Sequence, residues 1–218
     1  MIGTESREEY LETIFKLAAT DEGATITRIA QELGVKPASA SQMVGRLMDA
    51  GWLRRDESNR NRVVLTEAGS SEAVRLVRRH RLSERFLTEY LELPWDEVHE
   101  EACRLEHVLS DAMEAGLARR LGHPPTCPHG RIIPYEKEAT AREATRTLVD
   151  VEPGEECTVS HVSDESPEFL RYLASLGLLP GAPVGVTEVA PFEGPLMIVV
   201  EQVSRPLGRE VARKVFVR

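Results

Sequence analysis

Apolar residues in the first third of the chain recur at helical spacing, interrupted by short breaks. They predict a first helix from about Ser6 to Thr20, opened by a capping box that begins at Ser6. A second helix is expected from Thr27 to Leu33, and a third from Pro37, well placed in a first turn, to Ala50. Because only Gly34-Val35-Lys36 separates the last two, the pattern is typical of a helix-turn-helix.

Two short apolar runs follow the third helix directly. Trp52 to Arg55 and Arg62 to Leu65 flank the polar stretch Asp56 to Asn61, which predicts a hairpin with a charged tip. A helix-turn-helix followed by such a hairpin is the winged-helix order. We therefore expect a winged-helix domain over residues 1–70.

Long helical periodicity resumes after the hairpin. One helix is expected from Thr66 to about Leu91, and Leu93-Pro94 should end it. Another is expected from Trp95 or Asp96 to about Leu121, bent near Ala115-Gly116. The apolar residues of this second helix are available for self-association, so residues 71–134 are predicted to form a helical dimerisation domain.

The pattern of apolar, charged and turn residues changes again towards the C-terminus. Residues 135–147 form a charged segment that we interpret as a linker. From about Leu148 the chain has short β-branched runs separated by Gly/Pro turns, with a helix expected from Pro167 to Leu176. Residues 148–218 are therefore predicted to form a small β-barrel, which makes the chain an α+β protein of three domains.

Composition narrows the class of protein. The chain has 218 residues, 41% hydrophobic and 29% charged, as in ordinary globular proteins. No apolar run approaches the ~20 residues that cross a bilayer, and the first residues lack a secretory pattern, so no membrane association is expected. Three cysteines are too few for a disulfide framework and suit a reducing, cytoplasmic location. The net charge of −9 alone disfavours nucleic acid, but DNA responds to local patches.

Such a patch is expected on the third helix and the hairpin. Hydroxyl and amide side chains can hydrogen-bond base edges, and Lys and Arg neutralise phosphates. The residues of this predicted DNA-binding surface are Lys36, Ser39, Ser41, Gln42 and Arg46 in the helix region, and Arg54, Arg55, Arg60 and Arg62 on the hairpin. For each residue alone, the alternative is a solvated surface. The order of turn, helix and wing favours DNA binding.

Metal-ligating side chains line one stripe further along. His99, Cys103, Glu106 and His107 span an arc of about 100° and project from one side of a helix. His80 and Glu84 form an i, i+4 pair on the preceding helix, so two facing helices could build a site for a divalent transition metal. The alternative is a pair of polar helix faces with a small core cysteine. The chain lacks H-E-x-x-H and a nucleophile with its base, so we expect no enzyme.

These motifs resemble the diphtheria toxin repressor family of iron- and manganese-dependent regulators. The resemblance covers nearly the whole chain and is strongest in three segments: Glu9 to Ile14, Arg79 to Arg85 and His99 to Val108. The loop Cys127-Pro128-His129-Gly130 adds weaker support, since Arg131 departs from the family's usual Asn. The resemblance implies that the C-terminal barrel is SH3-like.

The resemblance also implies two metal sites. A primary, activating site would use Glu9, Cys103, Glu106 and His107. An ancillary site would use His80, Glu84, His99, Glu165 and Glu168. A carboxylate at Glu9 suits Mn²⁺ or Fe²⁺, whereas Cys103 matches the iron-type members, so Mn²⁺ leads slightly over Fe²⁺. Glu9 could instead hold the start of its helix, and Glu165 and Glu168 could be exposed acids at a helix start.

The function expected from these observations is that of a metal-dependent repressor of metal-uptake genes, which binds double-stranded operator DNA as a homodimer. Two alternatives stay open. One is a winged-helix regulator that senses a small molecule without metal. The other is a metalloenzyme with an accessory DNA-binding-like domain.

Overall fold

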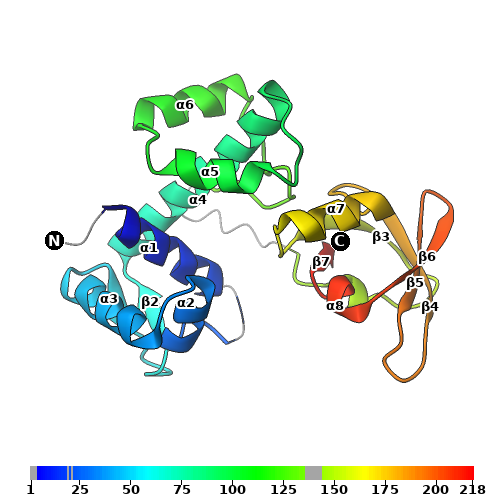
Figure 1. The fold of residues 1–218 in the computed structure, drawn as a ribbon, viewed down its shortest axis with the longest axis horizontal. Helices are drawn as coiled ribbons and strands as arrows, with labels where there is room; N and C mark the ends of the chain where they lie inside the picture. Colours follow the sequence, from blue (N-terminus) through cyan, green and yellow to red (C-terminus); the bar gives the residue numbers. More distant parts are fainter. Residues whose placement is uncertain (1–3, 19, 21, 136–143) are drawn as a thin grey trace. The chain divides into compact units, whose positions relative to one another are not determined.

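The computed structural model describes residues 4–18, 20, 22–135 and 144–218, which form two compact units (Figure 1). The first unit runs to Arg79 and adds Glu106–Val108 and a short stretch from Pro134. The second contains His80–Leu105, Leu109–Ile133 and the C-terminal part of the chain. Most of the predicted 135–147 linker, residues 136–143, lies outside the described residues.

The first unit has the predicted winged-helix order. Its elements are α1 (Thr4–Ala18), α2 (Ile26–Glu32), α3 (Pro37–Asp49), β1 (Leu53–Arg55) and β2 (Val63–Leu65). The two strands pair antiparallel. Thr25 caps α2 by accepting a hydrogen bond from the amide of Arg28, and Pro37 occupies the first turn of α3. Helix α1 starts before Ser6, so the expected capping box does not open it.

One hydrophobic core joins the three helices of this unit. The side chains of Leu11 and Ile14 on α1, Ile29 on α2 and Leu47 on α3 are fully buried. Complete burial of such a side chain stabilises a fold by about 1.5–3 kcal/mol. The core therefore fixes the orientation of α3, whose opposite face carries the polar residues noted above.

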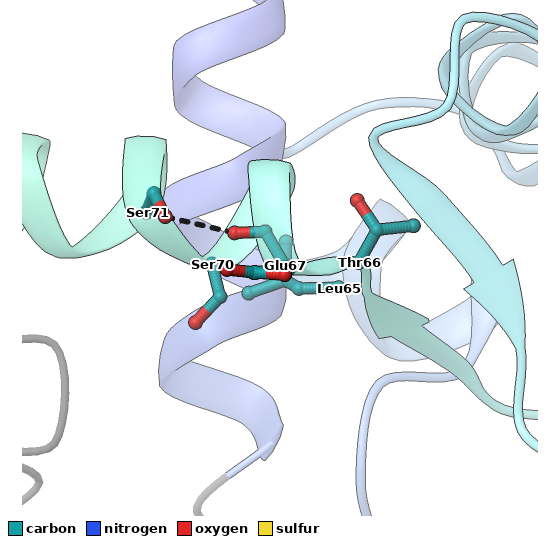
Figure 2. A pocket seen from close by; sticks show the side chains of 5 residues that line it. All are labelled: Leu65, Thr66, Glu67, Ser70 and Ser71. Carbon is teal, nitrogen blue, oxygen red and sulfur yellow. Dashed lines mark hydrogen bonds between the residues drawn. The ribbon is translucent and has the colours of Figure 1, made fainter.

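A closely packed turn connects the hairpin to helix α4 (Glu67–Tyr90) (Figure 2). Thr66 caps the helix: its Oγ1 accepts from the amide of Gly69 at 3.1 Å and donates to the Gly51 carbonyl at 2.7 Å. A Cβ on Gly69 would lie 2.2 Å from the carbonyl oxygen of Trp52, so only glycine fits there. A pocket at this junction is lined by Leu65, Thr66, Glu67, Ser70 and Ser71.

The helical part of the second unit differs from the prediction at one point. The single bent helix expected up to Leu121 is two helices, α5 (Val98–Glu106) and α6 (Asp111–Arg120). The break precedes Ser110, whose side chain accepts a hydrogen bond from the amide of Met113 and so starts a new helix. Gly116, where a bend was expected, lies inside α6.

The C-terminal part of the second unit is a small antiparallel sheet with the order β6-β5-β4-β3-β7. Its elements are η1 (Leu148–Asp150), β3 (Glu156–Val162), α7 (Pro167–Leu176), β4 (Pro183–Val189), β5 (Leu196–Val200), β6 (Val203–Leu207), α8 (Arg209–Ala212) and β7 (Val215–Val217). Leu170 and Leu173 of α7 are buried in the same core as the strands. The predicted α+β class, with an SH3-like C-terminal domain, is confirmed.

Three further observations bear on the expectations. Strand β6 was not predicted, because it is a largely exposed edge strand that contains Pro206. Cys103, Cys127 and Cys157 are all free thiols. None of the helices in the described part of the chain is both long and apolar enough to cross a membrane.

Candidate metal centre and nucleic-acid interface

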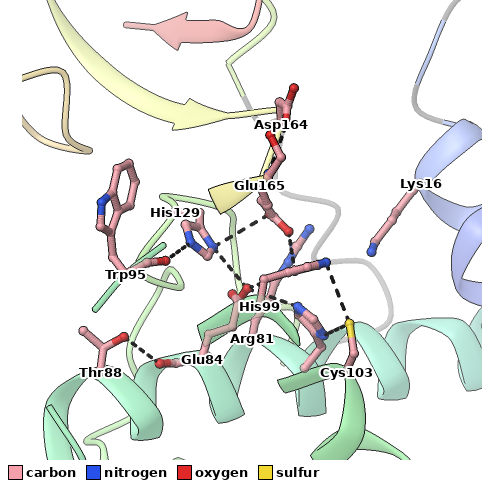
Figure 3. Close-up of polar contacts among 12 residues, drawn as sticks. Lys16, Arg81, Glu84, Thr88, Trp95, His99, Cys103, His129, Asp164 and Glu165 are labelled. Atoms are coloured by element: carbon pink, nitrogen blue, oxygen red, sulfur yellow. Dashed lines mark hydrogen bonds and ion pairs between the residues drawn. The ribbon is translucent and has the colours of Figure 1, made fainter. Parts of the chain in front are cut away.

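Helices α4 and α5 and the segment before α7 bring four donors together in the second unit, and Figure 3 shows three of them, Glu84, His99 and Glu165. Ligand atoms of His80, Glu84, His99 and Glu165 all lie within 4.8 Å of one another. Glu84 is 0% exposed and His80 only 4%. Four of the five residues that the resemblance implied for the ancillary set therefore lie together.

Glu84 is at the middle of this cluster. Its Oε1 lies 3.1 Å from His80 Nε2, 3.1 Å from His129 Nδ1 and 3.6 Å from His99 Nδ1. Burial alone would raise the pKa of Glu84, but the charge of His80 and the hydrogen bonds from these imidazoles outweigh it and hold the pKa well below its usual range. The second oxygen, Oε2, is buried and has no hydrogen-bond partner among the described residues.

An orphaned buried carboxylate oxygen costs free energy, and a bound cation would satisfy it. Imidazole, carboxylate and thiolate are the donor types of Mn²⁺, Fe²⁺ and Zn²⁺ sites. The residues around Glu84 therefore fit a divalent transition metal.

His99 links the carboxylates to a thiol. Its Nδ1 lies 2.8 Å from Glu165 Oε2, and its Nε2 lies 3.7 Å from Cys103 Sγ. Burial would lower the pKa of His99, but the hydrogen bonds with Cys103, Glu165 and Glu84 outweigh it and raise the pKa to about 11. Without metal, protons on such rings balance the buried acids, and a metal must displace them.

Cys103 contacts the ancillary histidines. Its Sγ lies 3.9 Å from His80 Nδ1, in addition to the contact with His99. Burial would raise the pKa of Cys103, but the hydrogen bonds with His80 and His99 outweigh it and lower the pKa to about 7. A substantial fraction of the thiol is therefore ionised at neutral pH, which is the form that binds metal.

Cys127 and His129 also reach Glu84, although neither was included in the expected ligand sets. Ligand atoms of Glu84, Cys127 and His129 lie within 4.8 Å of one another, and all three residues are buried. His129 Nε2 donates to the Trp95 carbonyl at 2.7 Å, and its Nδ1 hydrogen-bonds Glu84, so Nδ1 is the nitrogen that would face a metal beside Glu84 once its proton is displaced. The sequence signal for these two residues is the Cys127-Pro128-His129-Gly130 loop, whose resemblance to the family is weakened by Arg131.

A second group of donors lies in the first unit. His107 Nδ1 is 2.7 Å from Glu8 Oε2, and His107 Nε2 is 3.5 Å from Glu106 Oε1. A carboxylate oxygen of Glu12 lies within 4.8 Å of one of Glu106. Glu8 and Glu12, spaced i, i+4, share one face of α1 and are buried, whereas Glu9 is exposed.

Two of the expected ligands, Glu9 and Glu168, lie outside these groups of donors. Glu9 lies one position away from the buried face of α1, so the acid that contacts His107 is Glu8. Glu165 lies just before Ser166, the N-cap of α7, whereas Glu168 lies in the first turn of that helix. Glu168 is exposed, while Glu165 lies in the cluster.

The predicted DNA-binding surface is accessible. On α3 and the turn before it, Lys36, Ser39, Ser41, Gln42 and Arg46 are exposed, as are Arg54, Arg55 and Arg60 on the hairpin. Arg62 differs, because its side chain is half-buried and packs over Gly23, where a Cβ would lie 3.0 Å from Arg62 Cδ. Eight of the nine residues predicted to bind DNA are therefore exposed.

Three family models match the chain in sequence. They are the iron-dependent repressor N-terminal DNA-binding domain over residues 3–58, the iron-dependent repressor metal-binding and dimerisation domain over residues 66–135, and the FeoA domain over residues 146–218. Together they account for the winged helix, the helices that carry the donors, and the barrel.

Two curated relatives match this chain in sequence, one over nearly its whole length and one over part of it. The chain is 34% identical to the iron-dependent repressor IdeR of Mycobacterium leprae, covering 97% of this chain and 96% of the relative. It is 39% identical to the diphtheria toxin repressor of Corynebacterium diphtheriae over 60% of this chain and 57% of the relative.

Among solved structures, a manganese-dependent transcriptional repressor in complex with manganese superposes with a TM-score of 0.87 at 32% identity. The match covers 97% of this chain and 98% of that one. The resemblance in sequence, domain order and fold is therefore confirmed along the chain. The chain belongs to the iron-dependent repressor family, the family of metal-dependent transcriptional repressors that includes the diphtheria toxin repressor.

Proposed function

We propose that this protein is a cytoplasmic repressor of metal-uptake genes that binds operator DNA as a homodimer when Mn²⁺ or Fe²⁺ is bound. The observation that supports it most is the buried Glu84 with an orphaned Oε2 amid imidazole, carboxylate and thiol donors. Regulation rather than catalysis agrees with the repressors that the chain resembles.

The ligands that we propose fall into two sets. His80, Glu84, His99 and Glu165 form the ancillary set, and Cys127 and His129 extend it on the far side of Glu84. Glu106 and His107, with Glu8 in place of Glu9, form the activating set, whereas Cys103, expected there, contacts His80 and His99. When bound, the metal supplies positive charge that holds side chains from separate elements together.

Carboxylates and imidazoles make up most of both sets, and such donors suit Mn²⁺ and Fe²⁺. Mn²⁺ leads because acids outnumber thiols. In the relatives, IdeR is named as iron-dependent and a similar solved structure as manganese-dependent.

The experiment that tests this function measures binding of the purified protein to operator DNA, selected from genomic fragments in the presence of Mn²⁺. Fluorescence anisotropy at one stated salt concentration would compare Mn²⁺, Fe²⁺ and excess chelator. Allosteric coupling of about 1–3 kcal/mol predicts a 5–150-fold stronger affinity with metal. Equal affinity in chelator would favour a metal-independent winged-helix regulator.

The DNA-binding surface yields a paired prediction. Gln42→Ala should cost about 1–3 kcal/mol of discrimination at one base pair, since Gln42 is exposed on α3 and its amide can read a base edge. Arg60→Ala, at the exposed hairpin tip, should weaken binding to all sequences and reduce the salt slope by about 1. Titrations on matched and mismatched operators at several salt concentrations check both. A loss of specificity in Arg60→Ala with an unchanged salt slope would contradict this assignment.

Glu8 and Glu9 give a second pair of predictions, because only one of these adjacent acids is buried. Glu8→Gln should remove most of the metal activation of DNA binding, because Glu8 is buried against His107 and glutamine is a weak ligand. Glu9→Gln is the matched control, since Glu9 is exposed and one position away, and it should keep the activation. Anisotropy with Mn²⁺ and with chelator measures the ratio for each variant. If Glu9→Gln loses the metal activation and Glu8→Gln keeps it, Glu9 is the ligand and Glu8 is not.

A further inference from the structure

The imidazole rings of His80 and His99 in the second unit each lie between a sulfur atom and a carboxylate, and Figure 3 shows His99 beside Cys103. His80 has Cys103 Sγ 3.9 Å from Nδ1 and Glu84 Oε1 3.1 Å from Nε2. His99 has Cys103 Sγ 3.7 Å from Nε2 and Glu165 Oε2 2.8 Å from Nδ1. The same pair of rings therefore takes part in two potential donor sets.

A neutral imidazole has one lone pair for a metal, and its other nitrogen carries a hydrogen. Ligation together with Glu84 and Glu165 needs the lone pairs on His80 Nε2 and His99 Nδ1. Ligation together with Cys103 needs them on the opposite nitrogens, His80 Nδ1 and His99 Nε2. The two arrangements require opposite tautomers of both rings, so neutral rings can serve only one at a time.

The thiolate arrangement has supporting carboxylates already in place. With the lone pairs turned towards Cys103, His80 Nε2–H would donate to Glu84 across 3.1 Å, and His99 Nδ1 would face the Glu165 carboxylate in an ion-pair contact of 2.8 Å. A carboxylate that accepts from the far nitrogen of a ligating histidine fixes its tautomer and raises its basicity. The same two acids are ligands in one arrangement and supports in the other.

The spacing of the three donors also suits a small tetrahedral ion. Zn–N bonds of about 2.0–2.1 Å and Zn–S bonds of about 2.3 Å imply nitrogen-to-sulfur separations near 3.6 Å at tetrahedral angles. The observed separations from Cys103 Sγ are 3.7 Å and 3.9 Å. Cys103 and His99 are only half-buried, which leaves room for water as a fourth ligand.

We propose that His80, His99 and Cys103 form an alternative site for a borderline-soft ion such as Zn²⁺, and that its occupation excludes Mn²⁺ or Fe²⁺ from the His80–Glu84–His99–Glu165 set. Thiolate favours Zn²⁺ over Mn²⁺, whereas carboxylate favours the harder ion. Binding releases the thiol proton to solvent. The inference rests on the proposed function only in taking the carboxylate set as the Mn²⁺ or Fe²⁺ site.

Co²⁺ is the optical probe for this thiolate site, because a Co²⁺–thiolate bond gives a charge-transfer band in the near ultraviolet. A background with Cys127→Ser and Cys157→Ser leaves Cys103 as the only thiol. Titration with Co²⁺ should give the band at one ion per chain. His99→Gln in this background should abolish the band, whereas His107→Gln, the matched control on the other donor group, should keep it.

The reverse outcome, with the band lost in His107→Gln and kept in His99→Gln, would assign the thiol to the Glu106–His107 group and overturn the proposal. Absence of the band in the background itself would also overturn it. Circular dichroism and denaturant unfolding in chelator establish that each variant is folded. If His99→Gln does not fold, His80→Gln replaces it with the same expected loss of the band.

Exclusion is tested by counting bound Mn²⁺ from the free-ion signal in electron paramagnetic resonance. In the background variant, one equivalent of Zn²⁺ should release one Mn²⁺ per chain. Adding Cys103→Ser should reduce that release at least tenfold at the same Zn²⁺ concentration. Binding of Zn²⁺ without release of Mn²⁺ would refute exclusion. Neither readout involves DNA, so a metal-independent operator affinity would defeat the proposed function and leave this site standing.

Discussion

Replacing Glu84 with alanine should lower the free energy of unfolding of the metal-free protein by about 3–5 kcal/mol at neutral pH, the usual cost of removing one partner from a buried charged network. Glu84 is 0% exposed, and its Oε1 lies within 3.6 Å of nitrogens of His80, His99 and His129. Without it these rings lose the acid that balances their charge. The variant should also lose metal from the proposed ancillary set.

Urea unfolding in excess chelator measures this cost. Glu84→Gln is the informative partner variant, because it keeps the shape and one carbonyl acceptor while removing the charge, and its cost should be smaller. A loss below about 1 kcal/mol in Glu84→Ala would mean that the buried cluster does not depend on the charge of Glu84.

The pH dependence of the same cluster has a definite sign. The depressed pKa of Glu84 contributes stability above the unfolded value of about 4.3, and this is lost as pH falls through the folded pKa. The pKa of His99, raised to about 11, contributes stability that is complete below about 6.5 and declines as pH rises towards the folded value. Metal-free stability from this cluster should therefore be greatest between about pH 4.3 and 6.5.

Periodicity was enough to predict the winged helix and α7, because strong apolar stripes and clear stop residues mark those elements. It failed where a local hydrogen bond outweighed the pattern. The donors of α5 continue in register to His107, so nothing in the apolar stripe marked the break that Ser110 introduces. Strand β6 failed for the opposite reason, since an exposed edge strand carries little apolar alternation.

The candidate site was predicted in part. Spacing on one helix was enough to group His80 with Glu84. It could not decide between Glu8 and Glu9, because adjacent acids differ by only about 100° around a helix and the choice depends on the tertiary packing of α1. His129 reaches Glu84 through a loop whose path depends on tertiary contacts: a Cβ on Gly130 would lie 2.0 Å from the Ser160 carbonyl.

Saturating Mn²⁺ should stabilise the protein strongly, and Glu165 should carry a large share of that effect. An ion at 100 times its dissociation constant adds about 2.7 kcal/mol to the free energy of unfolding. Glu165 contributes a donor from the segment before α7, at 2.8 Å from His99. If Glu165→Gln weakens binding about 10–100-fold, the added stability at the same Mn²⁺ concentration falls by about 1.3–2.3 kcal/mol.

Glu168→Gln is the control for this measurement, since Glu168 is an exposed acid three residues further along and does not lie in the cluster. It should keep the full Mn²⁺-induced stabilisation. The lost helix-dipole interaction, worth about 0.3–1 kcal/mol, should lower the free energy of unfolding equally with and without metal. Urea unfolding of both variants, each with Mn²⁺ and with chelator, separates the two contributions. Equal Mn²⁺-induced stabilisation in the two variants would show that Glu165 is not a ligand, because a residue that binds the ion must affect the difference between the two conditions.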